Sequence, residues 1–382
     1  MLLPDRPFQP TVAPFLTGVL TSDQVADTAS AIVAVQEPSG AIPWFAGGHT
    51  DVWDHVESAM ALTAAGRRSE ADRANDWMLN TQRLDGSWPI RIDQGRVTDH
   101  GSDTNFSAYL ATGIWHRWLV SADHRSTAQA WPAVKAALGF VVSLQLPRGE
   151  VAWARGAAGP PVRTGLLAGS SSIYLSLRCG LALAELHREP QPGWELAAGL
   201  LGHVLRRHPE AFEVKDRFSM DWYYPVLAGP LAGAPAMARI EQRWDAFVRP
   251  GLGVRCVDDN PWVTGAETCE VALTLDVMGE KDRAVAMLSS MQHLREDDGA
   301  YWTGYVYSDD RRWPVEQSSW TAATVILAVD ALSSTTGGAG LFRGERLPQV
   351  TDVVGEHCGC RDAGTSPGRV AGLATHSFQD SQ

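Results

Sequence analysis

Carboxylates occur where several apolar helical segments are expected to begin. Six of them are candidates for acid–base chemistry: Asp54, Asp221, Asp258, Asp259, Glu267 and Glu316. A carboxyl group that is desolvated among aromatic side chains has a raised pKa and can donate a proton at neutral pH. Asp and Glu are also common at helix N-termini, where they cap backbone amides and interact favourably with the helix dipole. A capping role therefore stays open for each of the six.

Aromatic residues are concentrated in the same segments. Those that accompany the carboxylates are Trp53, Trp222, Tyr223, Tyr224, Trp262, Trp302, Tyr305, Trp313 and Trp320. Packing between helices is the alternative explanation for any one of them. Together they predict an aromatic-walled cavity with acidic groups at its rim. Such a cavity suits a sugar stacked on indole rings or an isoprenoid carbocation shielded by π-faces.

A short pattern of Gln, then Gly, then Trp recurs along the chain. It occupies residues 36–44, 82–88 and 145–153, and a weaker copy lies at 292–302. Self-similarity at a long period indicates a repeated supersecondary unit. Helical patterns lie in pairs between the copies, so the predicted unit is a helical hairpin introduced by a Gly/Trp turn.

Hydrophobic periodicity predicts helices in pairs. The pairs are 51–65 with 70–81, 105–120 with 128–144, 170–187 with 194–207, a short stretch after Pro225 with 236–248, and 262–278 with 281–291. The first helix, 22–35, and the last, 316–332, have no sequential partner, and by packing together they would close a ring. The first member of each pair is the more apolar, which places it inside. We therefore predict an all-α fold, an (α/α)6 toroid of six helical hairpins with inner and outer rings.

This organisation divides the chain into an irregular lead-in at 1–21, the toroid at 22–333 and a flexible tail at 334–382. The tail contains His357, Cys358 and Cys360, which form an incomplete metal motif that we assign to solvent-exposed residues. The long connections with the Gly/Trp turns all lie where inner helices begin. Long loops on a rigid scaffold usually carry function, so we expect the site at that end.

The composition excludes several classes of partner. The formal net charge of −12 argues against nucleic acid and against anionic membrane surfaces. No segment approaches the length of an apolar membrane span, and the N-terminus has no signal-peptide pattern. Five cysteines without paired spacing fit reduced thiols. We expect a cytoplasmic protein that binds a small molecule, without nucleic acid and without an integral membrane segment.

The phrase Gln82-Arg-Leu-Asp-Gly86-Ser-Trp88 resembles the repeat of the terpenoid cyclase and protein prenyltransferase toroid superfamily. The resemblance covers about residues 22–333 and implies acid-assisted cationic chemistry on an isoprenoid in a central aromatic cavity. Class II terpene cyclases of that superfamily carry an Asp-x-Asp-Asp acid. The stretch Cys256-Val-Asp258-Asp259 is similar, with cysteine at the first position. The resemblance thus implies Asp258 or Asp259 as the acid.

The same resemblance bears on cofactors. Glu267-Thr-Cys269 resembles part of the zinc site of prenyltransferase β subunits, but the sixth inner helix begins at Glu316 without a histidine. The sequence has no Asp-Asp-x-x-Asp motif for magnesium. The motifs for magnesium and for zinc are therefore incomplete, and we assign no metal ligand and no certain cofactor.

Toroids of six hairpins also occur among glycosidases and uronyl hydrolases, which use paired carboxylates and tryptophan platforms. The alternative hypothesis is a carbohydrate-active hydrolase or lyase with Asp54, Asp221, Glu267 or Glu316 as acid and base. A non-catalytic binding toroid is the third hypothesis. The leading hypothesis is an enzyme of the terpenoid cyclase or prenyltransferase type, so the small-molecule substrate is an isoprenoid or a carbohydrate.

Overall fold

The computed structural model describes residues 13–355, 358 and 360. The helices of this part of the chain are α1 (Ser22–Val35), α2 (Val52–Ala64), α3 (Arg68–Thr81), α4 (Thr104–Ser121), α5 (His124–Ser143), α6 (Leu167–His187), α7 (Pro192–Arg207), α8 (Ser219–Leu227), α9 (Gly233–Phe247), α10 (Gly265–Val277), α11 (Lys281–Ser290) and α12 (Ser319–Ser333). Two short 3-10 helices, η1 (Pro209–Ala211) and η2 (Gln292–Leu294), follow α7 and α11.

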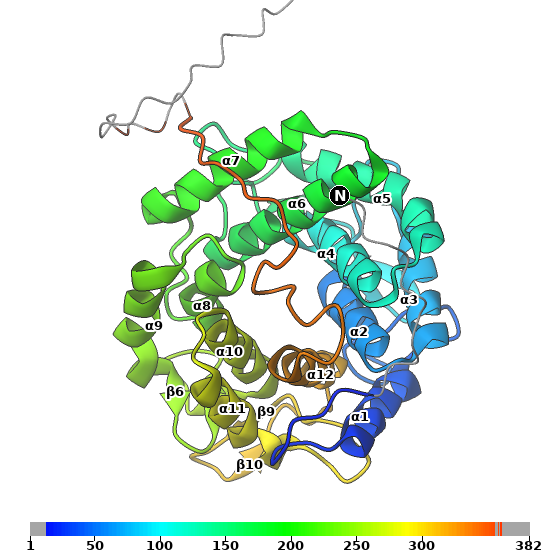
Figure 1. The fold of residues 1–382 in the computed structure, drawn as a ribbon, viewed down its shortest axis with the longest axis vertical. Coiled ribbons are helices and arrows are strands. Elements are labelled where there is room, and N and C mark those ends of the chain that lie inside the picture. The colour runs from blue at the N-terminus through cyan, green and yellow to red at the C-terminus, as the bar shows by residue number, and fades with distance from the viewer. Residues whose placement is uncertain (1–12, 356–357, 359, 361–382) are drawn as a thin grey trace, which may run out of the picture.

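The even-numbered helices form an inner ring and the odd-numbered helices an outer ring (Figure 1). Each inner helix contacts the next in the order α2, α4, α6, α8, α10, α12, and α12 returns to α2. The outer helices from α3 to α11 pack on the inner helices that precede them, while α1 packs on α12. The first and last helices therefore close the ring, which confirms the predicted (α/α)6 toroid.

The burial of each helix explains its place in the ring. In α12 every residue from Ser319 to Leu332 is buried, whereas α3 buries only one face, formed by Ala71, Ala74, Trp77 and Met78. A helix that is apolar nearly all round belongs inside, and an amphipathic helix belongs at the surface. By length and composition α6 could also cross a membrane, but most of it is buried in the inner ring, as in the core of a globular protein.

Helix α8 includes Pro225, whereas the sequence predicted that this inner helix begins after it. Proline has no backbone N–H, so the carbonyl of Asp221 loses its helical partner. Arg239 of α9 replaces that bond, because its Nη2 donates to the Asp221 carbonyl at 2.6 Å. Its Nε donates to the carbonyl of Trp222 at 2.8 Å. The neighbouring outer helix thus supports the short inner helix.

The repeated Gln/Gly pattern joins neighbouring outer helices. Gln82 follows α3, and its Nε2 donates to the carbonyls of Gly86, at 3.0 Å, and of Ala133 in α5, at 2.9 Å. Gly86 has a φ of +89°, and a Cβ atom at this position would overlap the carbonyl of Ala136. Only glycine combines this backbone angle with so close an approach. The pattern is therefore a docking device for helices.

The other copies repeat these contacts around the ring. Gln36 and Gly40 dock on α3, and Gln145 and Gly149 dock on α7, each glutamine bonding its glycine carbonyl and a carbonyl of the facing helix. Gly299 in the weaker copy lies against the backbone of α1 with a φ of +90°. Each turn attaches the end of one outer helix to the next, and the last copy attaches to the first helix.

Short antiparallel strands occupy the connections that lead into the inner helices. They are β1 (His49–Thr50), β2 (Arg91–Asp93), β3 (Arg96–Asp99), β4 (Ser102–Asp103), β5 (Ala154–Arg155), β6 (Val248–Arg249), β7 (Gly253–Arg255), β8 (Trp262–Thr264), β9 (Gly304–Val306) and β10 (Arg311–Arg312). They form sheets in the orders β1-β2-β3, β4-β5 and β10-β9-β8-β7-β6. Strands β1, β4 and β8 directly precede α2, α4 and α10, so the sheets fix where these helices begin.

Residues 334–355, which were expected to belong to a flexible tail, cross the end of the ring where the inner helices finish (Figure 1). Leu341 is buried, Arg343 pairs with Asp276 near the end of α10, and Arg178 Nε donates to the carbonyl of Pro348 at 3.1 Å. These contacts hold the segment in place although its sequence has no helical or strand periodicity. His357 and residues 361–382 lie outside the described residues.

Candidate active site

A cavity of about 510 Å³ lies at the end of the ring where the inner helices begin. Its walls come from the first turns of these helices and from the connections before them. The lining residues are Trp44, Asp51, Trp53, Asp54, Asp103, Thr104, Asn105, Phe106, Val151, Trp153, Leu166, Ala168, Gly169, Ser170, Ile173, Lys215, Phe218, Met220, Asp221, Cys256, Glu267 and Trp320. Residues 334–355 cross the opposite end of the ring (Figure 1).

Three of the five carboxylates in the cavity cap helices. Asp51 accepts a hydrogen bond from the backbone N–H of Asp54 at 3.0 Å, at the start of α2. Asp103 caps α4 by accepting two backbone N–H bonds, at 2.8 and 3.1 Å. Asp221 accepts the backbone N–H of Ala168 in the first turn of α6 at 3.1 Å, so it caps a helix other than its own. Helix capping therefore accounts for the positions of these three side chains.

Asp54 is a carboxylate of the cavity that caps no helix. Its pKa is raised well above the ordinary value by burial, then by the neighbouring Asp51, with smaller contributions from Glu57 and Glu270. Two adjacent carboxyl groups do not both ionise readily, so the position beside Asp51 adds to the effect of burial and favours the protonated form of Asp54.

Glu267, in the first turn of α10, is the other carboxylate of the cavity without a capping role. It is buried, and its Oε2 has no hydrogen-bond partner among the residues that the structure describes. Burial raises its pKa, while the Thr264 hydroxyl and the Cys256 thiol beside it favour the ionised form. Helices α2 and α10 both contact α12, so Asp54 and Glu267 enter the cavity from walls on either side of that helix.

Buried carboxylates hold the aromatic walls in place. Glu57 accepts hydrogen bonds from Tyr109 Oη and Trp320 Nε1, both at 2.7 Å. The Tyr109 ring stacks on Trp53 with a centroid distance of 4.5 Å and an interplanar angle of 2°. Burial raises the pKa of Glu57 to about 7. The buried Glu57 carboxylate therefore orients Trp320 directly and Trp53 through Tyr109.

Glu316, predicted as a catalytic candidate, orients a wall residue. Its Oε1 accepts the indole N–H of Trp44 at 2.8 Å and the hydroxyl of Thr303 at 3.2 Å. It does not line the cavity. The structure thus places Asp54, Asp221 and Glu267 together in the cavity and Glu316 behind its wall.

Asp258 and Asp259, the acids implied by the resemblance, do not line the cavity. Asp258 pairs with Arg243, and Asp259 pairs with Arg217 at 2.7 and 2.9 Å. Hydrogen bonding to Arg217 lowers the pKa of Asp259, and this side chain is exposed. An exposed carboxylate paired with arginine is the opposite of a protonated acid. The expectation that either residue supplies the acid to this cavity is therefore wrong.

The predicted aromatic residues are divided between the cavity and the rest of the fold. Trp53 and Trp320 line the cavity. Tyr223 and Tyr224 are buried and donate to Glu270, while Trp222 stacks on Phe247. The remaining four, Trp262, Trp302, Tyr305 and Trp313, lie on or beside the sheet that contains β8–β10, where Trp262 packs against Trp313 at 5.0 Å. Helix packing and sheet packing, the alternative named above, account for these seven residues, although Trp222 also lines a smaller neighbouring cavity.

Several aromatic lining residues were absent from the predicted binding set. Trp44 and Trp153 end two copies of the Gln/Gly/Trp pattern, so the repeat itself pointed to them. Phe106 and Phe218 have no such signal, because single phenylalanines at helix starts are common in cores. Their position becomes evident only when the ring closes.

Comparison with known proteins identifies the class of enzyme to which this chain is related. No known protein-family profile matches the chain. The MMP endo-(1,4)-3-O-methyl-alpha-D-mannosidase of Mycolicibacterium hassiacum is 58% identical over 348 residues, which cover 91% of this chain and 96% of that enzyme. Identity of this extent over nearly the whole length shows common descent.

Solved structures agree on the fold. A wild-type glycosidase superposes with a TM-score of 0.65 at 14% identity, covering 84% of this chain and 96% of its own. An α-amylase from Clostridium perfringens superposes with a TM-score of 0.57 at 10% identity, covering 80% of this chain and 97% of its own. A D-mannose isomerase superposes with a TM-score of 0.59 at 9% identity, covering 80% of this chain and 96% of its own. These similarities support the toroid alone.

Nothing in these comparisons supports a terpenoid cyclase or prenyltransferase. The sequence pattern that carried that resemblance docks outer helices onto one another, so it reports the toroid and is silent on its chemistry. The carbohydrate-active alternative agrees with the relative and with the paired carboxylates. The chain belongs to the glycosidase family represented by the MMP endo-(1,4)-3-O-methyl-alpha-D-mannosidase of Mycolicibacterium hassiacum.

Proposed function

We propose that this protein is an endo-acting glycoside hydrolase that cleaves internal (1,4) linkages between 3-O-methyl-α-D-mannose units. The identity of 58% to an enzyme named for this activity supports the proposal. The observation that carries it is the pair Asp54 and Glu267, two buried carboxyl groups that line one cavity and cap no helix. Glycoside hydrolysis usually requires two such groups on either side of the scissile bond.

The surroundings of the two carboxyl groups suggest different roles. Burial, then the neighbouring Asp51, with Glu57 and Glu270, all raise the pKa of Asp54 and favour its protonated form. Burial raises the pKa of Glu267 too, but the Thr264 hydroxyl and the Cys256 thiol oppose that rise. Different environments of two carboxyl groups suggest which is the acid and which the base. We therefore assign Asp54 as the proton donor and Glu267 as the base.

In the reaction, Asp54 donates its proton to the glycosidic oxygen as the bond from that oxygen to the anomeric carbon breaks. Glu267 accepts a proton from a water molecule whose oxygen bonds to the anomeric carbon. The products are two shorter sugar chains, and the two carboxyl groups exchange protonation states. Solvent returns both to their starting forms. The unpartnered Oε2 of Glu267 is the atom available to that water.

The lining of the cavity suits a methylated sugar. Its walls include the indole rings of Trp44, Trp53, Trp153 and Trp320. A methyl ether on O3 replaces a hydroxyl donor by an apolar group, which gains free energy against aromatic surface. Polar recognition remains available, since Asn105 Oδ1 and Ser170 Oγ, which are lining residues, are buried without partners among the described residues.

A second cavity gives room for a polymer. It has a volume of about 240 Å³ and shares Lys215 and Asp221 with the first cavity. An endo-acting enzyme must accommodate sugar units on both sides of the cleaved bond. The adjoining spaces support this mode over removal of single terminal units.

The test is hydrolysis of (1,4)-linked 3-O-methyl-α-mannose oligosaccharides, with unmethylated oligosaccharides of the same length as the matched substrate. We expect oligosaccharide products from internal cleavage and a clear preference for the methylated chain. The Asp258→Asn variant serves as a control, because this residue lies outside the cavity. Absence of hydrolysis, or release of terminal monosaccharides alone, would contradict the proposal.

A further inference from the structure

The C-terminal segment runs along the outer helix α7 after it has crossed the ring. The backbone N–H of Val353 donates to the Gly199 carbonyl at 3.1 Å, and Arg206 pairs with Asp352 at 2.5 Å. These contacts bring Cys358 and Cys360 to the C-terminal end of α7. Two histidines are there: His203 in the last turns of the helix and His208 at its C-cap.

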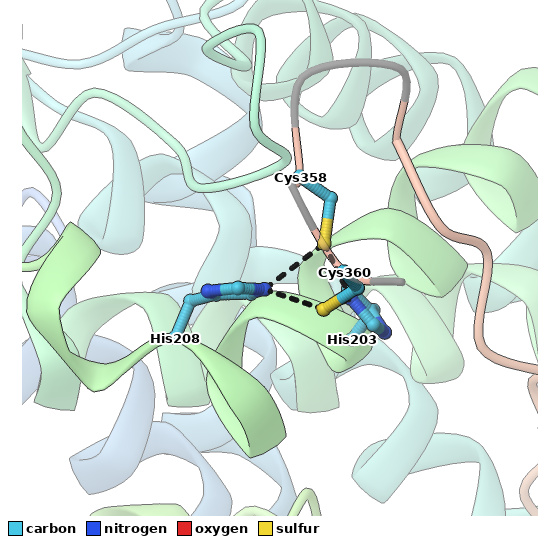
Figure 2. A group of neighbouring side chains, drawn as sticks. All are labelled: His203, His208, Cys358 and Cys360. Atoms are coloured by element: carbon cyan, nitrogen blue, oxygen red, sulfur yellow. Dashed lines mark hydrogen bonds between the residues drawn. The ribbon is translucent and has the colours of Figure 1, made fainter. Parts of the chain in front are cut away.

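The four side chains converge on one point (Figure 2). The Sγ of Cys358 lies 2.9 Å from Nε2 of His203 and 2.9 Å from Nε2 of His208. The Sγ of Cys360 lies 3.1 Å from Nε2 of His208 and 3.5 Å from Nε2 of His203. All four of these atoms lie within 4.8 Å of one another.

Hydrogen bonding alone accounts poorly for this cluster. Nδ1 of His208 contacts the Glu210 carboxylate at 2.8 Å, which selects the tautomer protonated at Nδ1. In the neutral ring Nε2 is then an acceptor, and it faces both sulfurs. The two thiols can donate only two hydrogen bonds, whereas four close contacts join their sulfur atoms to the histidine nitrogens. A carboxylate behind the imidazole is also the usual second partner of a metal-binding histidine, where it fixes the orientation of the ring.

We propose that His203, His208, Cys358 and Cys360 bind one zinc ion in a closed, tetrahedral, structural site. Two thiolates and two imidazoles form a ligand set typical of structural zinc. The two thiolate charges balance the charge of Zn²⁺, which suits a site where Cys358 and His203 are buried. With bond lengths of about 2.3 Å to sulfur and about 2.0 Å to nitrogen, a tetrahedral ion separates the two ligand types by about 3.5 Å. The shorter contacts need to lengthen by about half an ångström to admit it.

The site joins segments that are far apart in the sequence. The metal would fasten the C-terminal segment, which covers one end of the ring, to the outer helix α7. His208 also begins the connection to α8, which contributes Lys215 and Phe218 to the cavity wall. None of the four ligands lines the cavity, so the ion has a stabilising role and takes no part in hydrolysis.

The test measures metal in the full-length reduced protein. We expect one equivalent of zinc per chain after purification, removal by a strong chelator, and full return on adding zinc to the apoprotein. Cobalt in place of zinc should give the visible absorption of tetrahedral Co²⁺ together with a thiolate-to-cobalt charge-transfer band. The thermal midpoint of the apoprotein should rise on adding zinc, because the ion binds the folded state.

Variants localise the ion. Cys360→Ser removes the exposed ligand and is expected to fold. This variant and, separately, the His203→Ala variant should each lose zinc and the zinc-dependent rise in the thermal midpoint. Cys179→Ala removes a cysteine of α6 outside the cluster and should keep one equivalent of zinc. The proposal is overturned if the reduced wild-type apoprotein binds neither zinc nor cobalt, or if Cys360→Ser and His203→Ala retain zinc as the wild type does.

Discussion

Replacing Glu267 by glutamine should abolish most hydrolysis without disturbing the fold. The amide matches the shape of the carboxyl group and fits the same buried position. It cannot take a proton from water. Loss of a general base costs about 10²–10⁴-fold in rate, which corresponds to about 2.7–5.4 kcal/mol in the activation free energy. Because Asp54 and the aromatic walls are unchanged, we expect kcat to fall by this factor while KM changes little.

The assay is the steady-state rate on the methylated oligosaccharide, with the thermal midpoint recorded for each variant. The midpoint of Glu267→Gln should equal or exceed that of the wild type, because a carboxyl group whose pKa is raised by burial is unfavourable when ionised. Asp258→Asn should keep its rate within about two-fold, since its ion pair lies in a partly exposed position. Retention of more than about a tenth of the rate by Glu267→Gln would refute the assignment of the base.

Three further outcomes follow from the structure. Asp54→Asn should lower the rate on the oligosaccharide by about 10²-fold or more, but much less on an aryl glycoside whose leaving group needs no proton; equal losses on both substrates would argue against a proton donor. Gly86→Ala should lower the free energy of unfolding by about 3 kcal/mol or more, because of backbone strain and overlap with α5. Denaturant titration measures this loss beside that of Gly95→Ala. Gly95 has a similar φ but open space around it, so its replacement should cost only about 1 kcal/mol. Burial raises the pKa of Glu57 and of Asp103 to about 7, above unfolded values near 4. The folded state therefore binds more protons than the unfolded state between these values, and the free energy of unfolding should fall from about pH 5 to about pH 8. A rise across that window would contradict the burial of these groups.

The fold could be predicted because its signals are local. Apolar periodicity separated inner from outer helices, and the unpaired first and last helices implied closure. The Gln/Gly pattern was recognised as a repeat, although its physical basis, in which Gly86 approaches the backbone of α5, is visible only in three dimensions. Order in residues 334–355 was missed, because the contacts of Arg343 and Pro348 join segments distant in the sequence.

The candidate site could be predicted in part. Asp54 and Glu267 were among the six carboxylates, but nothing local separates them from Asp221, whose capping partner lies in another helix. Asp258 and Asp259 ranked first because of a motif, and the arginines that pair with them lie 15 and 42 positions away.

The metal cluster could not be predicted for the same reason. Cys358 and Cys360 were noted as part of an incomplete motif, and His203 and His208 complete the cluster from 155 and 150 positions before Cys358. A ligand set divided between an outer helix and the C-terminal segment leaves no spacing pattern in the sequence. It requires the segment to be placed along α7, which only the structure does.

The most direct test of the proposed chemistry is a crystal structure of the Glu267→Gln variant with a bound (1,4)-linked 3-O-methyl-α-mannose oligosaccharide. We predict that the sugar chain crosses the cavity, with a glycosidic oxygen within hydrogen-bonding distance of the Asp54 carboxyl group. A water molecule should lie beside the side chain at position 267, on the far face of the anomeric carbon. An oligosaccharide bound outside this cavity, or one whose glycosidic oxygens all lie away from Asp54, would contradict the account.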